Sequence, residues 1–541
     1  MNRYKNTLFF IVLIPVSLAL FLSFDYTGDY AINDDWGYST PIHWWSSERQ
    51  FNLTHWQSMP LITQLALGTV WSELFGYSQG NLRQLTLSLA LISCTTLFVC
   101  ARYLDIKPVL CAVCAVLPLS SPIFVGLSYS FMTDIPAIAI VMLASLFFVR
   151  SLKEPDDVWF YSLGVVFLLL AVLLRQTSVA LALALVVAEP VAKGFHTRRI
   201  FRSLAVLASA IAVYLVATKF LESSVGLPRA YGAKTDALLS FVSDVWSLNL
   251  GAFRKTIEAL IFAFSQFGLF VLPLLPIFLG VILMSRRRYL VVSIIGAILL
   301  LLASISMGVG VTFQEGGNIL TADGLGPRTI KGEAPINIPF SWVITALSHF
   351  GFLSAVMAGS LAIREHSQSS GYERPAVGSL LFLVLTAIIT FAPHTIAYAA
   401  VFDRYVLLPS VLLVLCIMWA VKDLAISRAS ISISAIFILV GFCISLGLTA
   451  DFFRWQDARY SLISRLVSVG YSETDIDGGF EFNNLTAVLS DQQNAVSMLL
   501  VEPEGRSVRI TRSVRPDDEV IASESYTRFF GSQTGTIYAI R

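Results

Sequence analysis

"FMTDIPAIAIVMLASLFFVR", residues 131–150, places one aspartate at the mouth of an otherwise apolar run. A helix needs about 20 largely apolar residues to cross the core of a bilayer, and this stretch has that length. The composition repeats the pattern, because 56% of the 541 residues are hydrophobic and 13% are charged. Ordinary soluble domains carry roughly 25% charged residues. The chain is therefore predicted to be an integral membrane protein.

Runs of this kind recur along the chain, and we expect each to form a membrane helix. They lie near 7–24, 83–104, 109–127, 135–150, 158–174, 177–192, 201–221, 257–284, 289–310, 341–363, 377–398, 405–422 and 429–450. The first run is predicted to be an uncleaved anchor, since no clear small-x-small cleavage site follows it. The predicted fold class is a mainly α, polytopic membrane protein with about 13 transmembrane helices.

Basic residues indicate how these helices are oriented. If the N-terminus is cytoplasmic, the cytoplasmic loops carry most of the lysine and arginine, as the positive-inside rule requires. The long loop 25–82 then faces outward. The net charge is +1, and we find no basic run interleaved with aromatic residues, so nucleic-acid binding is excluded as a function.

Two domains are expected from the change in composition after Ala450. Residues 1–450 form the transmembrane domain, and residues 451–541 form a small α+β domain on the outer side, with a helix packed on a few strands. Within the first domain, loop 25–82 contains five tryptophans and is predicted to lie along the membrane interface as short amphipathic helices. The Gly- and Pro-rich segment 311–340 is predicted to be a mobile loop that gates substrate entry.

A pair of carboxylates stands in the first outer loop, in "AINDDWGYS", residues 31–39. A helix N-cap would explain one of Asp34 and Asp35, but not both. Neighbouring residues on a helix do not share a face, so one carboxylate can point into a cavity while the other binds elsewhere. Charge at a membrane boundary is costly, which favours a functional role for the pair.

Three further charged residues are predicted at the outer ends of membrane helices: Asp134, Arg175 and Arg404. The alternatives are a helix start at Thr133 or Asp134, and arginines that extend to the interface. Taken together with the aspartate pair, they indicate a shared site for an anionic, phosphate-bearing substrate. His55, in "THWQSMP", remains a candidate contact for an acceptor or a metal, or an interface residue.

Several short motifs resemble, in order and placement, the GT-C fold of membrane glycosyltransferases. The resemblance is to glycosyltransferase family 39, which includes the protein O-mannosyltransferases and the lipid A aminoarabinose transferase. The motifs are "NDDWGY" (33–38), "HWQSMPLITQLALGTVWSELFG" (55–76), "FMTDIPAIAIVMLA" (131–144), "LLRQTS" (173–178), "DRYVLLP" (403–409) and "ETDIDGGFEFNN" (473–484).

The resemblance implies an inverting transfer of a sugar from a polyprenyl-phosphate carrier to a lipid, glycan or protein acceptor. It assigns the catalytic carboxylate to Asp34 or Asp35, a second acidic position to Asp134, and the carrier phosphate to Arg175 and Arg404, with Tyr405 beside them. A divalent cation, Mg or Mn, stays open as a cofactor. The implied location is a bacterial inner membrane within the cell envelope, with the site on the periplasmic side.

A transporter or flippase of lipid-linked sugars is the main alternative, followed by a glycan polymerase or ligase. A transporter should carry ionisable groups near the middle of the bilayer and show two related halves. The sequence shows neither feature, and glycosyl transfer is therefore the favoured prediction.

Overall fold

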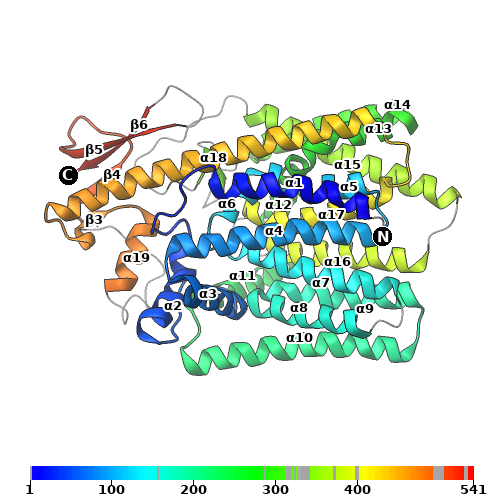
Figure 1. The fold of residues 1–541 in the computed structure, drawn as a ribbon, viewed down its shortest axis with the longest axis horizontal. Helices are drawn as coiled ribbons and strands as arrows, with labels where there is room; N and C mark the ends of the chain where they lie inside the picture. The colour runs from blue at the N-terminus through cyan, green and yellow to red at the C-terminus, as the bar shows by residue number, and fades with distance from the viewer. Residues whose placement is uncertain are drawn as a thin grey trace.

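The computed structural model describes residues 3–541 apart from 155–157, 248, 286, 311–318, 322–323, 327, 329, 331–340, 370–372, 397–400, 491–504 and 529–533. Most of the predicted gating segment 311–340 therefore lies outside the described residues. Long helices run side by side along the longest axis of the molecule (Figure 1). The C-terminal strands lie at one end of this bundle, and the N-terminus lies at the other.

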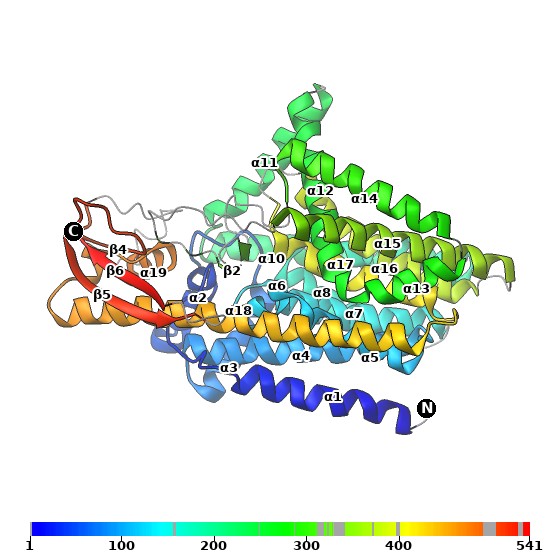
Figure 2. The same ribbon diagram turned by 90° about the horizontal axis from the view of Figure 1, so that it is seen from above.

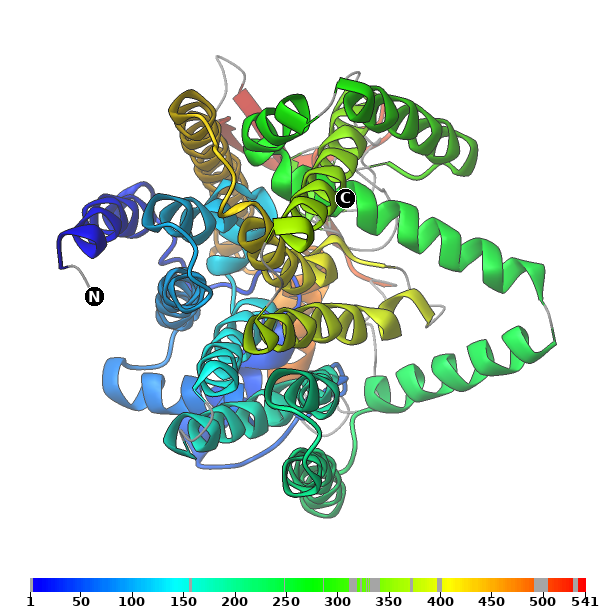
Figure 3. The ribbon, with the colours of Figure 1, turned by 90° about the vertical axis from the view of Figure 1, so that its right-hand side faces the viewer.

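Ten helices or helix combinations in the described residues are long and apolar enough to cross a membrane. They are built from α4 (Gln79–Tyr103), α7 (Asp134–Lys153), η2 (Gln176–Ser178) with α9 (Val179–Lys193), α10 (Thr197–Ser224), α12 (Leu250–Val271) with η3 (Leu272–Leu274) and α13 (Leu275–Ser285), α14 (Arg287–Met307), α15 (Ser341–Ser369), α16 (Arg374–Ile396), η4 (Asp403–Val406) with α17 (Leu407–Val421), and α18 (Arg428–Ser468). Two shorter apolar segments are Leu13–Leu22, within α1 (Arg3–Leu22), and α8 (Val158–Leu174). Seen end-on, α1 lies at the edge of the bundle (Figure 3). The polytopic α-helical prediction is confirmed.

The run predicted as one membrane helix near 109–127 is broken into two helical segments. The helical segments Pro108–Ser120 and Pro122–Ser128 meet at 73°. They comprise α5 (Pro108–Val116), η1 (Leu117–Ser120) and α6 (Pro122–Ser128). A residue before proline avoids the helical region, and Ser121 accordingly has extended backbone angles. If this broken pair counts as one span, the described residues contain up to 11 spans.

The first outer loop contains two helices, α2 (Asp35–Glu48) and α3 (Ile62–Phe75). Trp36 and Trp44 of α2 are 2% and 1% exposed and pack with Val488 of α19 (Phe480–Ser490). These tryptophans are buried by protein, whereas the sequence predicted an interfacial position for them. The loop is therefore an integral part of the core near the C-terminal region.

The C-terminal region contains a helix packed on strands, as the sequence predicted. Its sheet has the order β3-β4-β6-β5, with β3 parallel to β4 and the other pairs antiparallel. Its elements are η5 (Glu473–Asp475), β3 (Ile476–Asp477), α19, β4 (Val508–Thr511), β5 (Val520–Thr527) and β6 (Thr534–Ile540). A short hairpin, β1 (Leu320–Thr321) with β2 (Gly324–Leu325), precedes α15.

The last membrane helix continues beyond the expected domain boundary. α18 runs without a break from Arg428 to Ser468 and reaches the strands, as seen from two directions (Figures 1 and 2). The helix α11 (Arg229–Trp246) projects from the bundle on another side (Figure 2). The division into residues 1–450 and 451–541 stays a prediction, and the continuous helix links the two parts.

Candidate active site

The first aspartate of the pair is held by an arginine that lies 370 residues away in the chain. Asp34 occupies the N-cap position of α2, but its side chain caps no backbone N–H group. The Asp34 carboxylate instead accepts a hydrogen bond from the Arg404 guanidinium, with Nη2 and Oδ2 3.2 Å apart. The indole N–H of Trp56 also donates to Asp34. Helix capping therefore does not explain this carboxylate.

A second ion pair joins Asp134 and Arg175. Asp134 begins α7, where its neighbour Thr133 is the N-cap and makes no side-chain cap bond. Arg175 Nη1 lies 2.8 Å from Asp134 Oδ1, and the two side chains are 15% and 3% exposed. Arg175 stands between α8 and η2, where its extended backbone interrupts the helices. Asp134 and Arg175 therefore bind each other, whereas the sequence left open a helix start for Asp134 and an interfacial position for Arg175.

Tyr405 connects the two ion pairs. Its ring centroid is 5.6 Å from the Arg404 guanidinium carbon and 5.7 Å from that of Arg175. The ring of His394 stacks on Tyr405 at a centroid distance of 3.9 Å. Attraction between a guanidinium group and an aromatic ring favours this arrangement. Tyr405 thus lies near both guanidinium groups, although Arg175 and Arg404 are far apart in the sequence.

The backbone around Arg404 is fixed by its neighbour Asp403. The Asp403 carboxylate accepts the backbone N–H groups of Ile319, Leu320 and Arg404, at 3.1, 2.7 and 2.7 Å. These bonds attach η4 to the hairpin of β1 and β2. The position of the Arg404 side chain is therefore determined by a rigid turn.

The two adjacent aspartates have different surroundings. Burial raises the pKa of Asp34 above its ordinary value, while the charge of Arg404 and the hydrogen bond from Trp56 oppose that effect. Burial raises the pKa of Asp35 to about 7, against the charge of Arg83. The carboxylate oxygens of Asp35 are buried, and the backbone N–H of Phe131 also opposes the effect of burial on the Asp35 pKa. Asp34 therefore pairs with Arg404, and Asp35 lies in a different buried position.

His55 has a different partner. Its Nδ1 accepts the backbone N–H of Arg229, at the start of α11, with a distance of 3.2 Å. Burial lowers the pKa of the imidazole, and the charge of Arg229 lowers it further. The structure thus brings together Asp34, Asp134, Arg175, Arg404 and Tyr405. His55 instead binds the start of α11.

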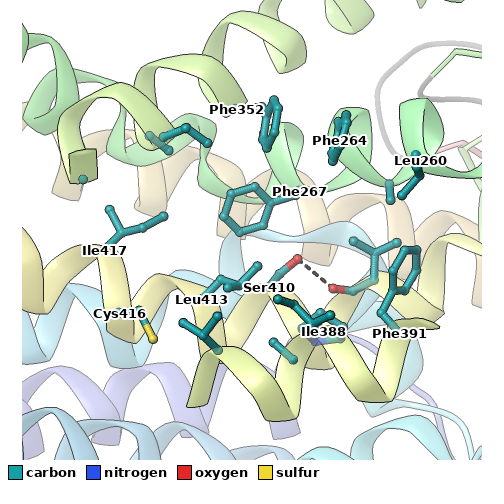
Figure 4. Close-up of a pocket in the computed structure, with 18 of the residues that line it drawn as sticks. Leu260, Phe264, Phe267, Phe352, Ile388, Phe391, Ser410, Leu413, Cys416 and Ile417 are labelled. Atoms are coloured by element: carbon teal, nitrogen blue, oxygen red, sulfur yellow. Dashed lines mark hydrogen bonds between the residues drawn. The ribbon is translucent and has the colours of Figure 1, made fainter. Parts of the chain in front are cut away.

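An apolar cavity of about 510 Å³ opens beside η4, between α12, α15, α16 and α17 (Figure 4). Phe264, Phe267, Phe352 and Leu413 are among the side chains that line it. The Ser410 hydroxyl donates to the Val406 carbonyl at 2.7 Å, so this polar group is already satisfied. Val406 lines the cavity and directly follows Tyr405. The cavity is thus bounded at Val406, one residue along the chain from Tyr405, and its other walls come from helices that are long enough to cross the membrane.

The carboxylates do not form a metal-binding arrangement. Within the described ranges, no three His, Cys, Asp or Glu side chains gather in a way that could hold a metal ion. Asp34 and Asp134 each face a guanidinium group, whose positive charge opposes a cation at the same oxygens. This donor set does not fit the Mg or Mn ion that the resemblance left open.

Some side chains at the site were missed by the sequence analysis. Asp403, Trp56 and Tyr38 are buried or half-buried beside the predicted residues, and His394, which stacks on Tyr405, was not singled out either. Asp403 and Trp56 each stand next to a predicted residue in the chain, in "DRY" and "HW". This adjacency is a weak signal. Tyr38 ends the quoted motif "NDDWGY", four residues after Asp34, whereas the stacking of His394 on Tyr405 leaves no pattern in the sequence.

Residues 62–221 match the sequence profile of a family described as dolichyl-phosphate-mannose-protein mannosyltransferase. The chain resembles these membrane glycosyltransferases. The resemblance predicted from the motifs is confirmed over this part of the chain, which runs from α3 to α10. Among curated proteins, no sequence matches this chain.

Two solved structures have a similar course of the chain. ArnT from Cupriavidus metallidurans bound to undecaprenyl phosphate is 11% identical, with a TM-score of 0.43, and the match covers 98% of this chain and 97% of that one. The archaeal oligosaccharyltransferase AglB from Archaeoglobus fulgidus, in complex with an inhibitory peptide and a dolichol-phosphate, is 12% identical, with a TM-score of 0.44. That match covers 83% of this chain and 56% of the other.

Proposed function

We propose that this protein transfers a sugar from a polyprenyl-phosphate carrier to an acceptor hydroxyl, with inversion at the anomeric carbon. The observation that carries the proposal is the pairing of two buried carboxylates with two arginines around Tyr405, next in the chain to Val406, which lines an apolar cavity. A lipid-linked phosphate needs cations for its phosphate and an apolar space for its lipid chain, and this region of the protein has both. The match of residues 62–221 to a mannosyltransferase family supports the same reaction class.

The arginines would bind the carrier phosphate. A guanidinium group carries five N–H donors, so Arg404 and Arg175 retain donors beyond those used in their pairs with Asp34 and Asp134. Charge-assisted bonds to phosphate oxygens are among the stronger hydrogen bonds in proteins. When the glycosyl phosphate bond breaks, the electron pair stays on the phosphate. The two cations stabilise the charge that develops there.

Asp34 would act as the general base. It accepts the proton of the acceptor hydroxyl, whose oxygen attacks the anomeric carbon on the face opposite the phosphate. Because a bound phosphate competes for Arg404, it reduces the compensation of the Asp34 charge and makes this carboxylate a stronger base. Asp134 orients Arg175 and lies close enough for its charge to act on Asp34. Asp35 is the second candidate for the base, and it is the weaker choice because Arg404 pairs with Asp34.

The apolar cavity would hold part of the prenyl chain. Most of its lining is apolar, and the Ser410 hydroxyl donates to the Val406 carbonyl. The helices around it are long and apolar enough to lie within a bilayer. A carrier lipid could therefore keep its tail among α12, α15, α16 and α17 while its phosphate reaches Arg404. The proposal routes no step through a metal ion.

The proposed location is a bacterial inner membrane, with the site and residues 451–541 on the periplasmic side. The support is the distribution of lysine and arginine over the loops. The acceptor is a lipid, a glycan or a protein.

Transfer from radiolabelled polyprenyl-phosphate sugars to membrane extracts, by the purified full-length protein, tests the proposal. We expect labelled acceptor, and the same yield when a chelator is present. Movement of the labelled carrier across vesicles without transfer would favour the flippase alternative. Absence of both transfer and donor binding, from folded protein, would reject the proposed function.

A further inference from the structure

The C-terminal region contacts the backbone of the first outer loop, which we call the catalytic loop (residues 25–82), through a buried glutamate. Glu481, in the first turn of α19, is 0% exposed. Its Oε1 accepts the backbone N–H of Asn33 at 3.3 Å, and its Oε2 accepts a hydrogen bond from Arg459 Nη1 of α18 at 3.2 Å. Asn33 directly precedes Asp34. One side chain thus connects the last membrane helix to the loop that carries the proposed base.

Asn33 has an unusual backbone conformation. Its φ angle is 54°, in the left-handed region that residues other than glycine adopt at a cost. Such a conformation persists only where the surroundings hold it in place. The hydrogen bond from the Asn33 N–H to Glu481 is one such restraint, and it acts at the residue where the chain turns into α2.

The start of α19 is itself fixed. The Asn483 side chain donates to Asp477 at 2.7 Å and accepts the backbone N–H of Gly478 at 3.0 Å. The ring of Phe480 lies 6.0 Å from Trp36 and 5.5 Å from Trp56, by centroids. Trp56 is the residue that donates to Asp34. α19 therefore contacts the catalytic loop at its backbone and at two of its tryptophans.

We propose that Glu481 is a positioning residue, which holds Asn33 in its left-handed conformation and thereby directs Asp34 toward Arg404. The C-terminal region then completes the active site. This inference rests on the proposed function for its effect on catalysis. Its structural part, the restraint on Asn33, stands without that function.

Kinetics of three full-length variants test the inference. Glu481→Ala should lower kcat by about 10- to 100-fold, because a misdirected catalytic group costs that much, while KM for the donor and binding of polyprenyl phosphate stay within about 2-fold. Glu481→Gln retains an acceptor for Asn33 and should restore most of kcat. Glu524→Gln is the matched control, because Glu524 pairs with Arg465 on the surface of the same region. An unchanged kcat in folded Glu481→Ala, or an equal loss in donor binding, would overturn the proposal.

Hydrogen exchange separates this inference from the proposed function. The Asn33 amide should exchange faster in Glu481→Ala than in the wild type, and at a near wild-type rate in Glu481→Gln, whether or not transfer is detected. Equal protection of Asn33 in all variants would reject the restraint. If Glu481→Ala does not fold, loss of the Asn33 protection in a folded Glu481→Asp variant, whose shorter side chain draws the carboxylate away, gives the same test.

Discussion

The two aspartates of the first loop occupy different environments, although they are adjacent in the chain. Asp34 is paired with Arg404, and Asp35 is buried near the backbone N–H of Phe131. One backbone step therefore separates a carboxylate in an ion pair from one whose pKa burial raises to about 7. This contrast leads to one prediction for Asp35 and one for Arg404.

The pH dependence of stability should change in Asp35→Asn. The pKa of Asp35 is raised in the folded protein to about 7, from an ordinary value of 3.8. Its contribution to stability is therefore fully present below about pH 4 and is lost as pH rises through about 7. We expect the difference in Tm between Asp35→Asn and the wild type to increase in favour of the variant over this range and then level off.

Glu73→Gln is the control for this measurement, because Glu73 is an exposed carboxylate whose pKa is lowered by Arg49. It should show no increase of that kind. A constant difference in Tm between Asp35→Asn and the wild type from pH 4 to 8 would contradict the prediction.

The phosphate-binding role of Arg404 should depend on the shape of its guanidinium group as well as its charge. Arg404→Lys retains the charge but loses the planar set of donors. We expect the affinity for polyprenyl phosphate to fall by about 10-fold or more, since a hydrogen bond to a charged group contributes about 1.5–3 kcal/mol. Equilibrium binding to protein in detergent measures this change.

Arg328→Lys provides the comparison, because Arg328 is also buried and paired, at 2.7 Å, with Asp451. Its variant should keep the wild-type affinity for the carrier. Equal affinities of Arg404→Lys and the wild type would remove Arg404 from the phosphate site.

At the scale of elements, the sequence predicted the apolar helices well and their breaks poorly. Every expected run falls on a described helix or helix pair, because a span needs a long apolar stretch that composition alone reveals. The bend at Ser121 follows from Pro122, a local signal that the apolar count ignored. The burial of Trp36 under α19 could not be read from the sequence, since the partner residues are far away in the chain.

The candidate site shows the same division. Motifs and helix ends identified Asp34, Asp134, Arg175 and Arg404, whose charges are unusual beside apolar runs. Which carboxylate meets which arginine is a tertiary property, because Asp34 and Arg404 are separated by 370 residues. The sequence favoured Asp34 over Asp35 only through the resemblance, and the structure distinguishes them by the pairing of Asp34 with Arg404.

The apolar cavity between α12, α15, α16 and α17 should select carriers by the length of their prenyl chain. Gly359 of α15 lines the cavity, and a Cβ added there would meet only the Ile417 side chain, at 3.9 Å. Gly359→Leu should fill part of the cavity and weaken binding of a long polyprenyl phosphate by about 10-fold, because each excluded CH₂ group contributes about 0.8 kcal/mol. Binding of geranyl phosphate, which has the same headgroup, should change little.

Gly359→Ala adds a methyl group that the site accommodates, and it should bind both carriers as the wild type does. Similar losses for long and short carriers in Gly359→Leu would show that the cavity is not the site of the prenyl chain.

The whole molecule places a charged site between two different surroundings. On one side are helices long enough to cross a membrane, with an apolar cavity among them. On the other are the first loop and the C-terminal strands, which lie together at one end of the bundle (Figure 1). Because α18 passes from the bundle into the C-terminal region without a break, the two parts form one support for the site. The account thus depends on the chemistry at Asp34 and Arg404.

Single-turnover transfer by protein preloaded with a radiolabelled polyprenyl-phosphate sugar tests that chemistry most directly, with Asp34→Asn and Asp35→Asn compared with the wild type. The account predicts that Asp34→Asn still binds the donor and transfers about 10²- to 10⁴-fold more slowly, the range for loss of a general base, while Asp35→Asn transfers at close to the wild-type rate. Transfer at the wild-type rate by donor-loaded Asp34→Asn would contradict the account.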